Sequence, residues 1–283
     1  MRAARHRLAS LSLVFTLVLT PRVDVRAQEA AAQAATTAAQ SSKIWLGKAL
    51  DIETYLKTAE ILEMQDIPIG VTKPRRAKLA PGGPVDALAW KPIRPGIYGG
   101  FFESYKSEIA AYELDKLLKL DMVPPKVERR VKGDIGVAVM WCPSVRSFKE
   151  MGGVPGTGKI PGPPSTEFAR WNLQITRAKM FDNLVGNPDP NLGNWLVDPQ
   201  WNLILIDHTR SLTTNKDLFH KMNRVDATLW ERMKGLDEPS LTAAIGSWIG
   251  KGEIRAILAR RDKMQKLIDE LVKAEGEANV FVK

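Results

Sequence analysis

Short apolar runs separated by turn residues dominate the first half of the chain, and two stretches keep a helical spacing instead. Helical spacing predicts one helix over 52–64 and a second that begins at a Ser104 cap and runs to about Leu120. Strands are predicted at the remaining apolar runs, at 67–72, 76–80, 87–92, 127–131 and 136–141.

The pattern changes after a segment rich in glycine and proline at 151–166. From there a helical stripe covers 168–185 and stops at Gly186, and the tail between 228 and 272 predicts two or three more helices. We therefore expect an α+β fold of two lobes. A small β-rich N-lobe with a leading helix would occupy 43–150, and a helical C-lobe would occupy 167–283.

The first 27 residues have the pattern of a secretory signal peptide. A basic start precedes an apolar core of about 13 residues, and the small-residue site Val25-Arg26-Ala27 follows. The core is shorter than a bilayer requires, and no later run is long enough to cross a membrane, although an uncleaved anchor is the alternative. Residues 28–42 predict a flexible spacer. The sequence thus predicts an exported protein, either periplasmic or secreted, or held in a secretory lumen.

Charge argues against a nucleic-acid partner. The formal net charge is +9, and removing residues 1–27, with five arginines and one aspartate, leaves +5. Basic residues are spread along the chain, with no dense basic run interleaved with aromatics, so nucleic-acid binding is not indicated. The excess slightly favours an anionic ligand.

Few soft metal ligands are present. Cys142 is the single cysteine, which excludes an internal disulfide, and only His208 and His220 follow the predicted signal peptide as histidines. A Cys/His zinc site is therefore not indicated. Oxygen ligands, which Mg²⁺ and Mn²⁺ prefer, remain for any metal.

The stretch GNPDPNLGNWLVDPQWNLILIDHTRSL, residues 186–212, carries the candidate chemistry. Two apolar runs around a turn predict a hairpin, and pairing centred on Gln200-Trp201 would place Asn194 opposite Asp207. Opposed Cα atoms lie about 4.5–5.5 Å apart, so one oxygen from each side chain would reach a common small cation. Asp189 lies five residues before Asn194 and is placed for an acceptor hydroxyl, a division of roles that phosphoryl transfer requires.

A second glycine-rich stretch, GVPGTGK at 153–159, matches the spacing of a phosphate-binding P-loop. However, Ile160 stands where a metal-binding Ser or Thr is needed, and prolines follow where a helix should begin. We interpret this stretch as part of the linker.

Asp189-x4-Asn194 followed by Asp207 resembles the catalytic loop and metal aspartate of the atypical protein-kinase-like superfamily. The loop NPDPNLGNWL is similar to that of type II phosphatidylinositol 4-kinases. The upstream half resembles the secreted Golgi casein kinase/Four-jointed family and, more distantly, HipA-like kinases. The blocks ALAWKP, SEIAAYELDKLL and VPPKVER carry this second resemblance. Together with the loop, the resemblance spans about residues 65–212.

The resemblance implies a role for each matching residue. Lys91 would hold the inner phosphates of ATP, and Glu108 would pair with Lys91, with Glu103 and Glu113 as nearby alternatives. Asp189 would orient or deprotonate the acceptor, while Asn194 and Asp207 would bind Mg²⁺ or Mn²⁺. The turn from Thr72 to Arg76 occupies the place of the phosphate-covering loop. It lacks a Gly-x-Gly pattern, so we consider Lys73, Arg75 or Arg76 as alternative phosphate contacts, with solvated surface charges as the competing interpretation.

Two function classes follow. The first is an exported kinase that moves the γ-phosphoryl of ATP to a hydroxyl of a protein, sugar, lipid or small molecule. The second is a pseudokinase that binds a nucleotide or partner without turnover, because the phosphate loop is altered and His208 and Thr209 replace the usual Phe-Gly after Asp207. Transfer of another part of the nucleotide, such as AMP, is a third alternative.

Overall fold

The computed structural model describes residues 41–68, 74–189 and 191–282, and contacts place residues 40–283 in one compact unit. The predicted signal peptide and most of the predicted spacer lie outside the described residues. The mixed α+β fold is confirmed, with an antiparallel sheet in the N-terminal region and several helices after it.

A five-stranded antiparallel sheet has the strand order β1-β2-β3-β7-β6. The strands are β1 (Ile61–Asp66), β2 (Arg75–Leu79), β3 (Ala87–Lys91), β6 (Lys126–Val131) and β7 (Asp134–Met140). The short strands β4 (Gly96–Tyr98) and β5 (Phe101–Glu103) form a separate hairpin. β6 and β7 pair across the tight turn that the sequence predicts at Lys132-Gly133.

The two faces of this sheet are covered by different helices. Residues on one face, including Leu88, Trp90 and Met140, share a core with α2 (Ala49–Thr58). Residues on the other face, including Val137 and Val139, pack with α3 (Tyr105–Leu118). Because successive side chains of a strand alternate between faces, Lys91 points to the α3 side, next to the helix that carries Glu108.

The prediction of α3 is confirmed in detail. The Ser104 hydroxyl accepts the N–H of Lys106, and the helix ends where Lys119 adopts a left-handed conformation, φ 51°. Side-chain acceptance at the N-cap satisfies an N–H that the first helical turn leaves without a partner.

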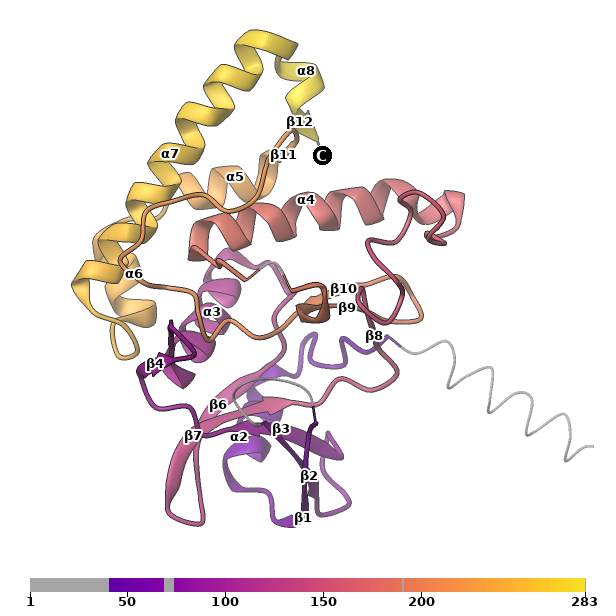
Figure 1. Ribbon diagram of the computed structural model, residues 1–283, viewed down its shortest axis with the longest axis vertical. Helices are drawn as coiled ribbons and strands as arrows, with labels where there is room; N and C mark the ends of the chain where they lie inside the picture. The colour runs from indigo at the N-terminus through magenta and orange to yellow at the C-terminus, as the bar shows by residue number, and fades with distance from the viewer. Residues whose placement is uncertain (1–40, 69–73, 190, 283) are drawn as a thin grey trace, which may run out of the picture. The chain divides into compact units, whose positions relative to one another are not determined.

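The second half of the described chain is mainly helical. The elements are η1 (Ser165–Glu167), α4 (Phe168–Val185), η2 (Leu192–Asn194), α5 (Ala227–Lys234), α6 (Glu238–Ile245), α7 (Lys251–Glu275) and α8 (Glu277–Val280). A small sheet joins β8 (Arg146–Ser147), β9 (Trp195–Val197) and β10 (Leu203–Leu205), and β11 (Val225–Asp226) pairs with β12 (Phe281–Val282). In Figure 1 the five-stranded sheet lies on one side of β8 to β10, and α4, α5 and α7 lie on the other. Residues 151–160 form turns and bends, and residues 161–164 are irregular.

The predicted helix over 52–64 is wrong in its second half, because α2 ends at Thr58 and β1 begins at Ile61. The Arg129 guanidinium donates to the carbonyls of Leu56 and Ala59, which belong to the last turn of α2 and its cap. This contact comes from β6 and is not visible in the local pattern. The predicted strand at 67–72 is also misplaced, since the strand precedes Ile67 and residues 69–73 lie outside the described ones.

The predicted register of the hairpin is wrong by one residue. The structure pairs Leu203 with Val197 and Leu205 with Trp195, so the loop is centred on Gln200. The reason is Asp198, whose Oδ1 accepts the N–H groups of Gln200 and Asn202 at 2.9 and 2.8 Å and closes a five-residue loop. By this register Asn194 lies opposite Ile206, whose N–H donates to the Asn194 carbonyl at 3.0 Å.

Asp198 also binds the last two residues of the predicted spacer. Ser41 Oγ and the N–H of Ser42 both donate to Asp198 Oδ2 at 2.9 Å, and Ser42 is buried. The spacer assignment over 28–42 is therefore wrong for its last two residues, which are anchored to the hairpin loop.

Candidate functional site

A buried cluster of two lysines and one glutamate lies between the sheet and α3. The Lys91 Nζ lies 2.6 Å from Glu108 Oε1, and the Lys126 Nζ lies 2.5 Å from Glu108 Oε2. The side chains of Glu108 and Lys126 are fully buried. The expected pairing of Lys91 with Glu108 is thus present, and Lys126 is an additional partner that the sequence analysis missed.

Strand register explains why both lysines reach the same carboxylate. Lys91 of β3 pairs with Val137, and Lys126 of β6 pairs with Val139, so the two lysines flank β7 on one face of the sheet. The β6-β7 hairpin signal could have placed Lys126 on a face, but only the position of β3 beside β7 shows that this face is shared with Lys91.

Burial and charge act against each other in this cluster. Burial by itself disfavours the charged forms, but Lys126 and Lys91 hold the pKa of Glu108 well below its usual range. Asp207 and Glu108 outweigh the burial of Lys91 and raise its pKa above the usual value. Burial dominates for Lys126, whose pKa is lowered. The Lys91 ammonium is therefore a firmly charged group in this site.

Asp207 completes the cluster from the hairpin side. Its Oδ1 lies 2.9 Å from Lys91 Nζ and accepts from Thr209 Oγ1 at 3.1 Å, and its side chain is 30% exposed. Asp207 has a left-handed backbone, φ 62°, which turns the chain directly after β10. The buried Glu103 of β5 holds the following segment by accepting from Thr209 Oγ1 and from the Arg210 guanidinium, at 3.2 and 3.0 Å.

Asp189 and Asn194 contact each other at the other side of the hairpin end. The Asn194 Nδ2 donates to Asp189 Oδ2 at 3.3 Å, and Asp189 Oδ1 accepts the N–H of Asn191 at 3.0 Å. Among the described residues no hydrogen bond is made by Asn194 Oδ1 or Asp207 Oδ2. These two oxygens, an amide and a carboxylate, are of the type that a hard divalent cation prefers.

Two cavities adjoin these residues. One, of about 560 Å³, is lined by Lys91, Glu108 and Asp207 together with apolar side chains such as Val139, Leu196 and Ile206. The other, of about 460 Å³, contains Asp189 and is lined by Phe148, Trp171, Trp195 and His220, among others. Lys91 and Asp207 thus line one cavity and Asp189 lines another.

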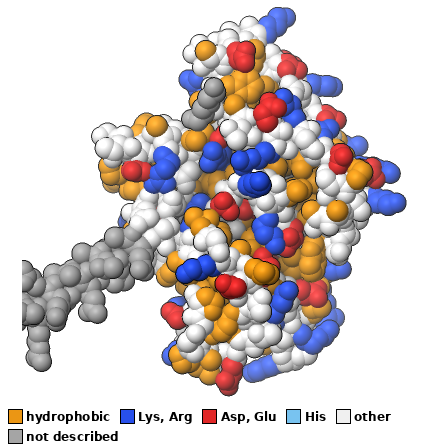
Figure 2. Space-filling model, turned by 180° about the vertical axis from the view of Figure 1, so that it is seen from behind, with side chains coloured by type: hydrophobic (Ala, Val, Ile, Leu, Met, Phe, Trp, Pro, Cys, Tyr) orange, Lys and Arg blue, Asp and Glu red, His pale blue; other side chains and the backbone are white. Residues whose placement is uncertain are grey.

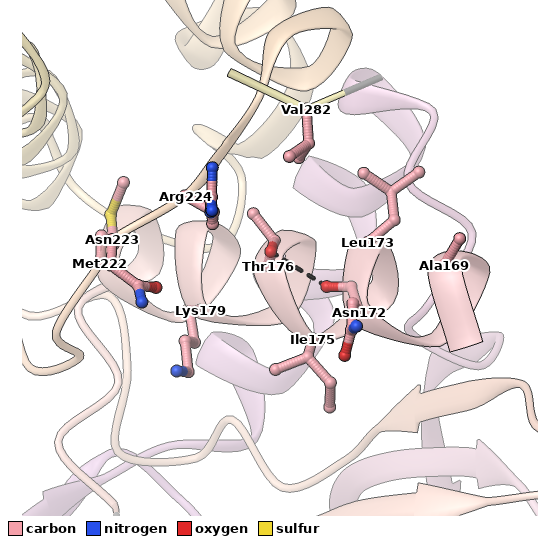
Figure 3. Close-up of a pocket in the computed structure, with 10 residues that line it drawn as sticks. All are labelled: Ala169, Asn172, Leu173, Ile175, Thr176, Lys179, Met222, Asn223, Arg224 and Val282. Atoms are coloured by element: carbon pink, nitrogen blue, oxygen red, sulfur yellow. Dashed lines mark hydrogen bonds between the residues drawn. The ribbon is translucent and has the colours of Figure 1, made fainter. Parts of the chain in front are cut away.

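A third cavity of about 600 Å³ lies on a different side of α4, between that helix, Arg224 and Val282 (Figure 3). Figure 3 shows Ile175 and Lys179 on the side of α4 away from Val282. Both residues also line the cavity that contains Asp189.

The other predicted phosphate-contacting residues do not line the cavity of Lys91 within the described part of the chain. Lys73 lies outside the described residues. Arg75 is the first residue of β2, not part of a turn, and its guanidinium lies 4.8 Å from the ring centroid of Trp90. It does not line the cavity of Lys91. Lys159, at the end of GVPGTGK, is followed by turn and irregular residues up to η1, which agrees with the linker interpretation.

The described residues contain neither a multi-ligand metal cluster nor a membrane-spanning helix. Within the described part of the chain, no group of three or more His, Cys, Asp or Glu is arranged to hold a metal ion. In residues 41–68, 74–189 and 191–282 no helix combines the length and apolar character needed to cross a bilayer.

Figure 2 shows acidic and basic side chains interspersed over one face of the molecule.

No family model and no curated protein matches the sequence, whereas many solved structures match the fold. A crystal structure of the Golgi casein kinase superposes with a TM-score of 0.61 at 17% identity, over 83% of this chain and 78% of that one. The chain has the fold of an atypical protein kinase.

Two other kinase-fold structures agree. The Golgi casein kinase with Mn/ADP bound gives a TM-score of 0.60 at 16% identity, over 83% of this chain and 78% of that one. The structure of hydra Fam20 with sugar gives 0.63 at 16% identity, over 83% of this chain and 92% of that one. The resemblance to the Golgi casein kinase is confirmed at the level of fold. The resemblance of the Asp189 loop to phosphatidylinositol 4-kinases stays a prediction.

Proposed function

We propose that the chain is a metal-dependent kinase that transfers the γ-phosphoryl of ATP to a hydroxyl acceptor. The observation that carries the proposal is the joint contact of Lys91 with Glu108 and Asp207, at 2.6 and 2.9 Å, inside a cavity of about 560 Å³. A buried lysine that is fixed and kept charged by two carboxylates has the electrostatics required to hold nucleotide phosphates.

The position of each residue in the site suggests a separate role for it. Lys91 would bind the inner phosphates, and Glu108 would fix its ammonium. Asn194 Oδ1 and Asp207 Oδ2 would hold Mn²⁺ or Mg²⁺, which supplies charge neutralisation for the transferring phosphoryl group when bound. Asp189, in the neighbouring cavity, would orient the acceptor hydroxyl. Positioning and electrostatic stabilisation account for catalysis, so no covalent intermediate is required.

Mn²⁺ is the first metal to test, because one similar structure contains Mn/ADP. The combination of one amide and one carboxylate leaves most coordination positions to phosphate oxygens and water. A metal bound in this way should depend on the nucleotide for its affinity.

Thermal unfolding with ATP and Mn²⁺, singly and together, tests the binding step. We expect a stabilisation only with both, of about 2.7 kcal/mol at a hundredfold excess over Kd. For a chain of this size that corresponds to a rise in Tm of about 5–10 °C. No shift in any combination would contradict nucleotide binding.

Substitutions separate binding from transfer. Asp207→Asn should remove the metal-dependent shift, and Asp189→Ala should keep the shift but lower phosphoryl transfer at least about a hundredfold. Asp217→Asn is the matched control, because Asp217 forms an exposed ion pair with Lys263 and lies outside both cavities. Transfer that is unchanged in both Asp207→Asn and Asp189→Ala would refute the assignment.

A pseudokinase is the second candidate, favoured by the Thr72 to Arg76 turn without a Gly-x-Gly pattern and by His208-Thr209 after Asp207. The two candidates differ in turnover. A pseudokinase would show the shift with ATP and Mn²⁺ but no loss of label from γ-labelled ATP. Mass spectrometry of the product would separate phosphoryl transfer from AMP transfer.

The proposal includes export, which rests on the signal-like pattern of residues 1–27. N-terminal sequencing of the protein recovered from outside the cytoplasm should begin at Gln28. Recovery outside the cytoplasm with Met1 retained would contradict cleavage, and recovery only from the cytoplasm would contradict export.

A further inference from the structure

His220 lies in the same cavity as Asp189 and has no role in the function proposed above. The cavity wall around it is largely aromatic, with Phe148, Trp171 and Trp195. The His220 ring lies 6.0 Å from the Trp195 ring, and its side chain is 22% exposed. A partly exposed imidazole in an acceptor cavity is available to a bound hydroxyl.

The backbone at His220 is fixed by a fully buried asparagine of α4. Asn183 Oδ1 accepts the N–H groups of Phe219 and His220, both at 2.8 Å, and Asn183 Nδ2 donates to the His220 carbonyl at 2.9 Å. Three hydrogen bonds to one short segment hold it in place with little freedom. The imidazole therefore has a defined position although it lies outside any helix or strand.

The neighbouring residue of α4 holds the imidazole itself. Asp182 is 1% exposed, and its Oδ2 lies 3.4 Å from His220 Nε2. Neither of these two buried atoms makes a hydrogen bond within the described residues, and at 3.4 Å a small adjustment would let each satisfy the other. Because Nε2 faces Asp182, Nδ1 is the nitrogen left for a molecule in the cavity.

A chain of hydrogen bonds links this pair to the loop of Asp189. Asn187 Nδ2 donates to Asp182 Oδ1 at 3.2 Å, and the N–H of Asp189 donates to Asn187 Oδ1 at 3.2 Å. Asp182 thus positions His220 with one oxygen and the Asp189 loop with the other. A carboxylate that orients an imidazole and stabilises its protonated form is the arrangement that activates a hydroxyl in nucleophilic enzymes.

His208 does not share this role. It is 1% exposed, lies 3.8 Å from Asp182 Oδ1, and does not line the cavity. Burial and the nearby Lys126 lower the pKa of His208 to about 4, so it stays neutral. The carboxylate of Asp182 is therefore shared between one inaccessible histidine and one that reaches the cavity.

We propose that His220, oriented by Asp182, is a catalytic residue that accepts the proton of the acceptor hydroxyl while Asp189 orients that hydroxyl. This inference rests on the proposed kinase function. In the step, the acceptor O–H bond breaks, its oxygen bonds to the γ-phosphorus, and the bond from that phosphorus to the bridging oxygen breaks to release ADP. The proton ends on His220 Nδ1, and Asp182 balances the charge of the imidazolium.

The test uses water as the acceptor, because ADP release from Mn²⁺-ATP can be measured without knowing the natural substrate. His220→Ala should lower kcat about a hundredfold with little change in the KM for ATP, since a positioned base contributes about 10²–10⁴ in rate. Added imidazole should raise the kcat of His220→Ala at least about tenfold. The thermal shift with Mn²⁺-ATP should be retained, which shows that the variant is folded and binds nucleotide.

Phe219→Ala is the matched control, because Phe219 is 38% exposed and only its backbone N–H contacts Asn183. Its kcat should stay within about twofold of the unchanged protein. An unchanged kcat in His220→Ala, or a loss that imidazole does not restore, would overturn the role of His220 and leave the kinase function standing. No ADP release by the unchanged protein would overturn the kinase function itself, and the role of His220 with it.

Discussion

Removal of the Glu108 charge should destabilise the fold far more than an exposed charge on the same helix. Among the described residues Glu108 is the only ion-pair partner of Lys126, and both side chains are fully buried. In Glu108→Gln the Lys126 ammonium stays buried without a carboxylate, whereas Lys91 keeps Asp207. Breaking a buried pair from one side typically costs about 3–5 kcal/mol.

This loss of unfolding free energy can be expressed as a change in Tm. For a domain of this size about 1 kcal/mol shifts Tm by 2–4 °C, so Glu108→Gln should lower Tm by about 10 °C. The control is Glu113→Gln on α3, because Glu113 is partly exposed and pairs with Lys116 at 3.0 Å. An exposed helical pair contributes only about 0.3–0.5 kcal/mol, so the control should shift Tm by about 2 °C or less.

The pH dependence provides a second readout. Burial already lowers the pKa of Lys126, and loss of Glu108 lowers it further. The unfolded state then binds more protons than the folded state at pH values just below the ordinary lysine pKa, so the stability of Glu108→Gln should rise as the pH approaches that pKa. Combining it with Lys126→Met should recover part of the lost stability at pH 7. A Tm within about 2 °C of the unchanged protein would refute this account of the cluster.

Two further predictions concern other buried groups. Burial raises the pKa of Asp115 to about 7, against the N–H groups of Met122 and Val123, so the folded state binds the extra proton between about pH 4 and 7 and the stability falls over that range. Asp115→Asn keeps an oxygen acceptor, so its Tm should exceed that of the unchanged protein by a small margin at pH 4 and by a larger one at pH 8; equal Tm differences at both values would contradict this. Burial raises the pKa of the Cys142 thiol to about 12, so at pH 8 only about one thiol in 10⁴ is ionised. Iodoacetamide should therefore label Cys142 only in denaturant, and rapid labelling of the folded protein would show that the thiol is accessible.

Local sequence signals were sufficient to predict the end of a helix or strand where a cap or a turn residue marks that end. Ser104 at the start of α3, Gly186 at the end of α4 and the Lys132-Gly133 turn each act within four residues, and the structure agrees with the sequence at all three. The resemblance to atypical kinases pointed to Lys91, Glu108 and Asp207 as site residues, and the structure brings these three together.

Contacts between distant segments could not be read from the pattern. Arg129 decides where α2 ends, and Asp198 decides the register of the hairpin through a loop geometry that differs by one residue from the expected one. Lys126 and His220 each look ordinary in sequence, since a lysine in a strand and a histidine in an irregular segment usually face solvent.

The sequence by itself determined the order of the elements and the residue types available for phosphate and cation chemistry, because helix caps, turns and apolar spacing are short-range interactions. The tertiary structure decided which charges are buried together and which side chains share a cavity. Those properties depend on the pairing of β3 with β7 and on the packing of α4 against the loop of Asp189, and the free energy of burying a charge depends on its neighbours in space.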